Sequence, residues 1–482
     1  MRGSNPRPTV YKTVALPAEL SRPDLTATRA RRAGKAAGRG PDPFETGPAR
    51  ARADRLWRND PLSCITAADA PAGNRRKQGD RPMKKLHPAC LAAAAALAAP
   101  AALAQETVTF GVIGGVSGPI AALAPPIMDA SRVAFDEVNA QGGLLDGAMI
   151  EVATGDSGCN PQAGGDAASK VLNVDGAVAI VGAHCSGATL SAANSVTIPA
   201  GRILISPAST APALTGLEDD DTVFRTAPAD DYQGAALART LAAEGYGPIA
   251  VTYLNNDYGV GLAEAFRAEY EAQGGEIAAF AAHEEGKASY RAELAELARS
   301  GADAVAIFAY GEGSGLTMMR EALENGFFER FVGGDGMKNE ALIAEIGAEN
   351  LTTFVASGTF GEGGEALAIF EEAFAAAGGD PSSPYVKEGY DAGFLLAMAY
   401  EHAGGDVARM PASLRAVATA PGEPILPGEW AKAKELIAAG EEVDYRGAAG
   451  DAEFDMNGDV PGSFALFEVG EDGAFAVRTE MR

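Results

Sequence analysis

Two neighbouring stretches decide the fold: MIEVATGDSGCNP at residues 149–161 and AVAIVGAHCSGAT at residues 177–189. Each begins as an apolar run with β-branched residues, changes to small, hydroxylated and glycine residues around a cysteine, and then feeds a helical pattern. A third run, ILIS at 203–206, leads into PASTAPAL in the same way. Strands that alternate with helices form parallel sheets whose carboxyl edges carry ligand sites. The pattern therefore predicts an α/β fold with a binding cleft at this edge.

The alternation of strand and helix continues along the chain. Further strands are expected at 108–113, 248–254, 277–283, 304–308 and 331–333, and helices at 124–139, 259–273, 290–300 and 385–402. Composition shifts near 226–228, near 357–358 and in AEFDMNGDVPG (452–462) predict three crossings between two lobes. Each lobe should be a mostly parallel sheet flanked by helices, and a three-stranded hinge would let the lobes close around a ligand.

The first 104 residues have a different character. Residues 1–82 carry 17 Lys and Arg against 8 Asp and Glu without apolar periodicity, so they are expected to stay outside the core. Lys84 and Lys85 then precede an apolar run at 91–99 and the small-residue site 102–104. This order is typical of a secretory signal peptide at 83–104, which predicts a periplasmic chain that begins at Gln105. Residues 1–82 are then an over-extended gene model, which we favour, or a basic arm.

Charge excludes several partners. From Gln105 onward the chain has 20 Lys and Arg against 57 Asp and Glu. Nucleic acid and anionic membrane surfaces would repel such a protein, so neither is expected as a partner. We expect a monomer that binds a small molecule.

Motifs for catalysis, cofactors and metals are also weak. Ser314 in GEGSG stands one position too late for a nucleophile elbow, and the glycines from 111 to 118 do not match the dinucleotide fingerprint. The histidines after Gln105 form no metal-binding pair. Asp455, Asn457 and Asp459 alternate as in a calcium loop, but Gly458 precedes Asp459, which favours a hairpin turn. We therefore predict no enzyme, no cofactor and no metal.

Cys159 and Cys185 are the two cysteines that follow the signal peptide. An exported compartment is oxidising, so a disulfide is the expected state, and closing a loop of this length would contribute roughly 3 to 4 kcal/mol. A redox or metal-binding role is the alternative, although the adjacent His184 lacks a second ligand pair at zinc spacing.

The chain resembles the periplasmic substrate-binding proteins of ABC importers, of the branched-chain amino-acid-binding (Leu/Ile/Val) type. The resemblance runs in order through TFGVIGGVSGPIA, VAFDEVNAQGGLLDG, GDSGCNP, VGAHCSGAT, ILISPASTAPALT, VFRTAPADDYQG, LNNDYGVGLAEAF, GGDGMKN, PYVKEGYDA and EFDMNGDV. It implies a two-lobed type I periplasmic binding fold. With the crossings above, lobe 1 would comprise 105–226 and 357–452, and lobe 2 would comprise 227–356 and 453–482. It also implies a receptor that delivers an amino acid to a membrane permease.

A free amino acid is a zwitterion, so its site needs donors for the carboxylate and an acidic acceptor for the ammonium. Ser186 begins a predicted helix at 187–196, where unpaired N–H groups suit a carboxylate. Thr210, with Ala208 and Ser209, holds the equivalent place after the next strand. The alternative is that Ser186 and Thr210 only cap their own helices. Their common sheet edge and the resemblance favour ligand binding.

Asp335 is the candidate acceptor for the ammonium. It follows the strand at 331–333 and stands between two glycines that would let the backbone approach a ligand closely. The resemblance implies an acidic residue here, often Glu. A turn aspartate in a Gly-Asp-Gly loop is the alternative, because Asp is common in turns.

Two aromatic residues complete the candidate ligand-binding set. Tyr258 in NNDYGVG and Tyr310 in FAYGEG stand where the resembled family places aromatics against the ligand, although each could instead pack on a neighbour. Leu123 stands where family members often carry an aromatic residue, so solutes other than leucine or valine stay open. The alternatives for function are a ligand-sensing module, a receptor for a small amide or carboxylic acid and, least favoured, a hydrolase.

Overall fold

The computed structural model describes residues 106–361 and 363–481. The basic extension predicted at 1–82 and the signal peptide predicted at 83–104 lie outside the described residues. Within the described part, the helices are too short or too polar to cross a membrane. The structure therefore bears on the predicted two-sheet organisation and not on the export signal.

The first sheet has five parallel strands in the order β2-β1-β3-β4-β5. Its strands are β1 (Thr107–Gly114), β2 (Met149–Asp156), β3 (Ile180–Val181), β4 (Leu204–Ser206) and β5 (Val223–Arg225). Its helices are α1 (Ala124–Ala140), α2 (Pro161–Asn173) and α3 (Ser186–Ala192), which continues through a π-helical turn (Ala193–Thr197) into α4 (Ile198–Ala200). The strand predicted at 177–181 is regular only at Ile180–Val181, although Val178 and Ala179 still form backbone hydrogen bonds with β1.

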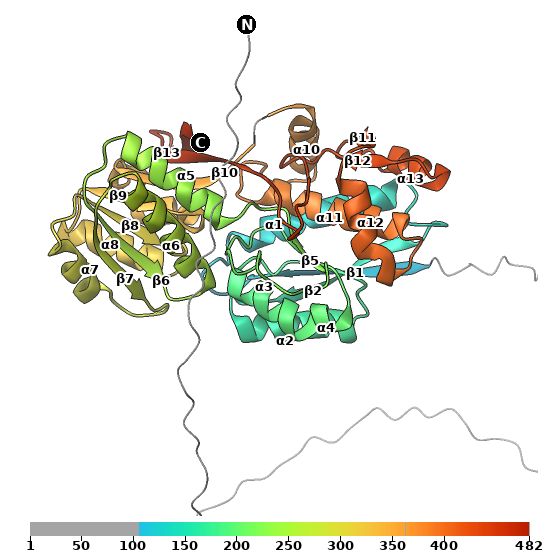
Figure 1. Cartoon of the computed structure of the whole chain (residues 1–482), viewed down its shortest axis with the longest axis horizontal. Helices are drawn as coiled ribbons and strands as arrows, with labels where there is room; N and C mark the ends of the chain where they lie inside the picture. The colour runs from blue at the N-terminus through green and yellow to red at the C-terminus, as the bar shows by residue number, and fades with distance from the viewer. Residues whose placement is uncertain (1–105, 362, 482) are drawn as a thin grey trace, which may run out of the picture. The chain divides into compact units, whose positions relative to one another are not determined.

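The second sheet has seven strands in the order β14-β13-β10-β9-β8-β6-β7. Parallel strands are β6 (Ile249–Leu254), β7 (Ile277–His283), β8 (Ala304–Phe308), β9 (Arg330–Gly333) and β10 (Phe354–Phe360). An antiparallel hairpin, β13 (Ser463–Val469) and β14 (Phe475–Met481), extends the sheet beside β10 (Figure 1). Flanking segments are α5 (Asp230–Ala243), α6 (Asp257–Ala272), α7 (Arg291–Ala298), α8 (Ser314–Asn325), the 3-10 turn η3 (Asp335–Met337), α9 (Glu340–Ile346) and η4 (Ala348–Asn350). Two mostly parallel sheets flanked by helices, as predicted, are confirmed.

The segment between β10 and β13 packs back onto the first sheet. It contains α10 (Glu365–Ala376), α11 (Val386–His402), η5 (Val407–Arg409), α12 (Met410–Ala418), β11 (Glu423–Ile425), α13 (Trp430–Ala439) and β12 (Val443–Tyr445). Figure 1 shows α11 beside α1, and the two helices share the hydrophobic core of β1 and β3. Gly389 permits this approach, since a Cβ there would lie 2.7 Å from the carbonyl oxygen of Ile127.

The chain thus passes between the two halves three times, after β5, after β10 and after β12. A buried ion pair joins the first and third passages: Arg225 Nε lies 2.5 Å from Asp459 Oδ1 and Nη2 lies 2.7 Å from Oδ2. Asp455 accepts hydrogen bonds from the N–H groups of Asn457 and Asp459. This segment is therefore a turn, but the expected hairpin is wrong because no strand directly precedes it.

Candidate functional site

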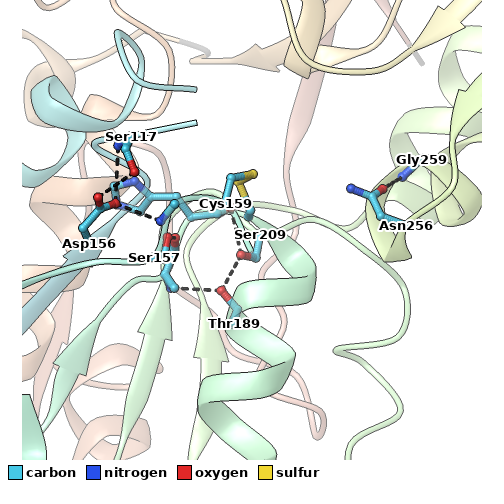
Figure 2. The surroundings of a disulfide bond; sticks show 12 residues. Ser117, Asp156, Ser157, Cys159, Thr189, Ser209, Asn256 and Gly259 are labelled. Carbon is cyan, nitrogen blue, oxygen red and sulfur yellow. Dashed lines mark hydrogen bonds between the residues drawn. A yellow bond between two sulfur atoms is a disulfide. The ribbon is translucent and has the colours of Figure 1, made fainter. Parts of the chain in front are cut away.

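The predicted disulfide between Cys159 and Cys185 is present (Figure 2). It ties the loop after β2 to the loop after β3, across 26 positions of sequence, and so constrains the unfolded chain by about 3.5 kcal/mol on the loop-closure model. Beside it, Asp156 accepts hydrogen bonds from the hydroxyl of Ser117 at 2.6 Å and from the N–H of Gly158 at 2.8 Å (Figure 2). The disulfide thus fixes two loops at the carboxyl edge of the first sheet.

Ser209 uses its side chain to hydrogen-bond the loops at the carboxyl edge of the first sheet to one another. Its hydroxyl donates to the carbonyl oxygen of His184 at 2.9 Å and lies 2.7 Å from the hydroxyl of Thr189, which accepts from the N–H of Ala183 (Figure 2). Ser209 is fully buried. Its side chain therefore positions the loops that carry Ser186 and Thr210.

Ser186 and Thr210 lie close together but neither caps a helix with its side chain. The α3 helix begins directly after Cys185, and the Ser186 hydroxyl accepts a hydrogen bond from the N–H of Ala211 at 3.2 Å. The helix expected after Thr210 is absent, and residues 212–216 form turns. In its place Arg225 Nη1 donates to the carbonyl oxygens of Thr210 and Ala211, 3.0 Å from each, and the Ala211 oxygen also accepts from the N–H of Leu214 in a turn.

Asp335 is a buried acceptor with donors from three separate elements. Its Oδ1 accepts from Tyr258 Oη at 2.8 Å and from Gln233 Nε2 at 3.0 Å, and its Oδ2 accepts from Tyr385 Oη at 2.6 Å. Asp335 is 6% exposed. The following Gly336 has no room for a side chain, since a Cβ would lie 2.7 Å from the carbonyl oxygen of Ala309. Asp335 is therefore not a solvated turn aspartate.

Asp230, in the first turn of α5, is a second carboxylate at this site. Its Oδ2 accepts from the Thr210 hydroxyl at 3.0 Å, so it joins the first sheet's edge to the second half. Asp230 is fully buried, and its Oδ1 has no hydrogen-bond partner among residues 106–361 and 363–481. Burial, and next the charge of Asp335, raise the pKa of Asp230 well above its usual value. Two buried acidic side chains therefore interact where the two halves meet.

Gln233 and Tyr385 join this cluster, and the sequence analysis did not single out either of them, nor Asp230. Gln233 donates to Asp335 and Ser357, while its Oε1 has no partner within the described residues. Tyr385 precedes α11 with φ 63°, a conformation that a bulky residue rarely adopts and that is typical of functional sites. All three stand in stretches that carried the resemblance, PADDYQG and PYVKEGY, and that position was the available signal.

Tyr258 and Tyr310 stack on each other, with ring centroids 5.1 Å apart and planes 17° apart. Tyr258 lies in the first turn of α6 and not in a loop, and Asn256 caps that helix by accepting from the N–H of Gly259 (Figure 2). Burial, and next the charge of Asp335, raise the pKa of both hydroxyls. Both tyrosines therefore stay neutral donors beside Asp335.

Apolar side chains border the same cluster. Ala208 and Leu123 pack against Ile127, Ala227 and Tyr385. Ala208 is half-buried, unlike the fully buried Ser209 that follows it. This wall is aliphatic on the side of the first sheet, as the sequence predicts from Leu123.

The two halves touch across the rim of the site. The N–H of Ala122, in the loop after β1, donates to both carboxylate oxygens of Glu312, at 2.9 and 3.1 Å. Glu312 follows β8 and also accepts from Asn339 Nδ2 at 2.9 Å. Hydrogen bonds to Glu312 therefore join the loop after β1 to the loops of the second sheet.

Comparisons with known proteins agree with this architecture. The family model described as "Periplasmic binding protein" matches residues 107–474. A leucine-, isoleucine-, valine-, threonine-, and alanine-binding protein of Pseudomonas aeruginosa is 30% identical over 319 residues, which cover 65% of this chain and 83% of the relative. A crystal structure of a leucine binding protein from Thermotoga maritima aligns with a TM-score of 0.67 at 23% identity, covering 78% of this chain and 99% of that one. A solute binding protein of an ABC transporter from R. palustris, in complex with benzoate, aligns with a TM-score of 0.63 at 20% identity and covers 78% and 96%.

Proposed function

The chain belongs to the periplasmic binding protein family, the solute-binding proteins of ABC transporters, and we propose that its solute is a free amino acid bound between the two sheets. The resemblance to Leu/Ile/Val-binding proteins is confirmed at the level of the family, and with it the type I fold. The family is non-enzymatic, as predicted for this chain.

The buried carboxylate pair carries the proposal. An ammonium group has three N–H donors, and the site offers the charge of Asp335, the unpartnered Oδ1 of Asp230 and the unpartnered Oε1 of Gln233. A cation placed between the two carboxylates would also favour the ionised form of Asp230. A carboxylic acid without an ammonium, such as the benzoate of the R. palustris protein, would instead meet two buried acidic groups. The site chemistry therefore favours a zwitterion.

The carboxylate end of the solute is assigned to the first sheet. Ser186 lies at its carboxyl edge and keeps its hydroxyl proton for a solute carboxylate, since its oxygen accepts from the N–H of Ala211. Thr210, whose hydroxyl donates to Asp230, links this edge to the acceptors for the ammonium. Ala208 and Leu123 supply an aliphatic surface for the side chain, and Tyr258 and Tyr310 cover the opposite side. Ser209 acts by positioning these loops rather than by contacting the solute.

The biological role that fits is delivery of this amino acid from the periplasm to a membrane permease. The predicted signal peptide at 83–104 would export the chain, and the predicted lobes would close on the solute before docking. A sensing module that reports occupancy to a signalling receptor would use the same closure. Uptake of labelled amino acid by vesicles that hold the cognate permease and ATPase separates the two roles, because a sensor would drive none.

The experiment that tests the solute class uses matched ligands. The purified chain is unfolded and refolded to remove any bound solute and then screened by thermal shift with leucine, isoleucine, valine, threonine, alanine, the other amino acids, benzoate and 4-hydroxybenzoate. A ligand at 100 times its dissociation constant adds about 2.7 kcal/mol of stability. For leucine, the matched analogues are 4-methylpentanoate, which lacks the ammonium, and 3-methylbutylamine, which lacks the carboxylate. Stabilisation by an amino acid but by neither of its analogues supports the proposal, whereas stabilisation by benzoate alone contradicts it.

A further inference from the structure

A hollow of about 260 Å³ lies directly beside Asp335. Its walls come from η3, the end of β10, α10, the loop at 381–385 and the start of α11. Asp335 and its hydrogen-bond partner Tyr385 form one wall, and Lys338 and Lys387 form others. The hollow is therefore continuous with the acceptor proposed for the ammonium, yet it contains two cationic side chains.

Lys338 is the cation without a counter-charge. Its ammonium lies over the ring of Phe467, 4.5 Å from the centroid, and 5.7 Å from that of Phe475. Within the part of the chain that the structure describes, the Lys338 ammonium makes no hydrogen bond or ion pair. Burial, and next the charge of Lys387, lower the pKa of Lys338 to about 8. A desolvated ammonium in this position gains from any anion that reaches it.

The other charged groups around the hollow do not neutralise Lys338. Lys387 Nζ lies 2.8 Å from Glu388 Oε1, so that pair is self-compensated. The Asp335 carboxylate already accepts three hydrogen bonds on its own wall. Glu371, on α10, is exposed to solvent, and the charges of Glu340 and Glu388, which raise the pKa of Lys338, do not outweigh burial and the charge of Lys387. The chain has a formal net charge of −26, so a hollow with an uncompensated cation is a locally positive site on an acidic protein, where an anion would be attracted.

We propose that this hollow binds a carboxylate and that the carboxylate belongs to the side chain of the same solute, which would then be an acidic amino acid. This inference rests on the proposed function, because the ammonium of the solute would occupy Asp335. Lys338 follows Asp335 by three residues across a 3-10 turn, in which side chains at i and i+3 lie on the same side, and both residues line the hollow. The second carboxylate would pair with Lys338. A separate small anion such as acetate has the same chemistry and is the other possible source.

The test compares L-glutamate, L-leucine and acetate by calorimetry on the full chain and on three variants. Lys338→Met keeps an unbranched side chain over Phe467 without the charge, Lys338→Arg keeps the charge, and Lys170→Met removes a surface charge from α2 as a control. Lys338→Met should weaken glutamate binding by roughly ten- to a hundredfold, as for a lost charge-assisted hydrogen bond, and leave leucine binding unchanged. Lys338→Arg should retain most of the affinity. Glutamate affinity of the unmodified chain should also fall as the pH rises through about 8, where free Lys338 loses its proton.

Each outcome separates this inference from the proposed function. Leucine binding with no binding of glutamate, or glutamate binding that is insensitive to Lys338→Met, overturns the inference and leaves the amino-acid receptor intact. Acetate binding that is lost in Lys338→Met, with leucine still bound, supports a carboxylate pocket but assigns it to a separate anion. Failure of every amino acid together with binding of benzoate overturns the proposed function itself.

Discussion

Replacing Asp335 with Asn removes one negative charge from the centre of the site and keeps the shape of the side chain. A bound ammonium would lose its main counter-charge while it stays buried, and breaking a buried ion pair in this way costs about 3 to 5 kcal/mol. That cost corresponds to an affinity loss of roughly 150- to 4,000-fold. Asp230 can offset part of it, because without the charge of Asp335 its carboxyl group ionises more readily. We therefore expect Asp335→Asn near the lower end of this range and the double variant with Asp230→Asn beyond it.

Calorimetry with the amino acid selected by the thermal screen measures this loss. The control is Asp136→Asn, which removes the same charge from an exposed position on α1 and should leave affinity unchanged. Thermal unfolding of each variant without ligand checks that the fold is retained. A folded Asp335→Asn protein with the affinity of the unmodified chain would show that the ammonium is bound elsewhere, and the zwitterion assignment would be abandoned.

Four further predictions concern linkage and stability. Because the pKa of Asp230 is raised in the folded protein, its contribution to the free energy of unfolding is present at acidic pH and is lost as the pH rises through the folded-state pKa. The melting temperature should therefore fall over this pH range, and Asp230→Asn should flatten the decline. An ammonium ligand should in turn release a proton from Asp230. The binding enthalpy measured by calorimetry should then vary with the ionisation enthalpy of the buffer, and this dependence should disappear in Asp230→Asn. Replacing both Cys159 and Cys185 with Ser should lower the free energy of unfolding by about 3.5 kcal/mol in urea titrations, and a loss below 1 kcal/mol would contradict the loop-closure estimate. Arg225→Met should destabilise the chain by about 3 to 5 kcal/mol because it strands a buried carboxylate, and an unchanged urea midpoint would show that this ion pair contributes nothing.

Local pattern predicts the parallel strands well. The strands at 277–283 and 304–308 were placed at their observed bounds, because both are continuous apolar runs between clear breaks. The terminal hairpin was missed since β14 is largely exposed and mixes charged and apolar residues. The absent helix after Thr210 shows a different limit. The segment is held as a turn, with Arg225, fifteen residues after Thr210, bonded to the carbonyl groups of Thr210 and Ala211, and no local pattern contains that contact.

The same reason limits prediction of the site. Asp335 stood out because its own neighbours, two glycines after a strand, are unusual. Asp230 looks like any acidic residue in the first turn of a helix, a favourable place for a negative charge. Its role depends on Asp335 and Thr210, which approach it only in the folded chain. Residues that depend on long-range contacts for their role can therefore be identified from a family resemblance or from the structure, but not from their local sequence.

The hydrogen bond between Glu312 and the Ala122 N–H would affect how much ATP an importer hydrolyses without moving a solute. Only protein atoms take part in this clasp, so it does not require a solute, and a hydrogen bond to a charged group contributes about 1.5 to 3 kcal/mol. A clasp of that strength shifts the ratio of closed to open molecules by roughly ten- to a hundredfold. Empty receptors would then resemble loaded ones to the permease and provoke ATP hydrolysis without cargo. Glu312→Gln should reduce that idle turnover and leave solute-driven turnover largely in place.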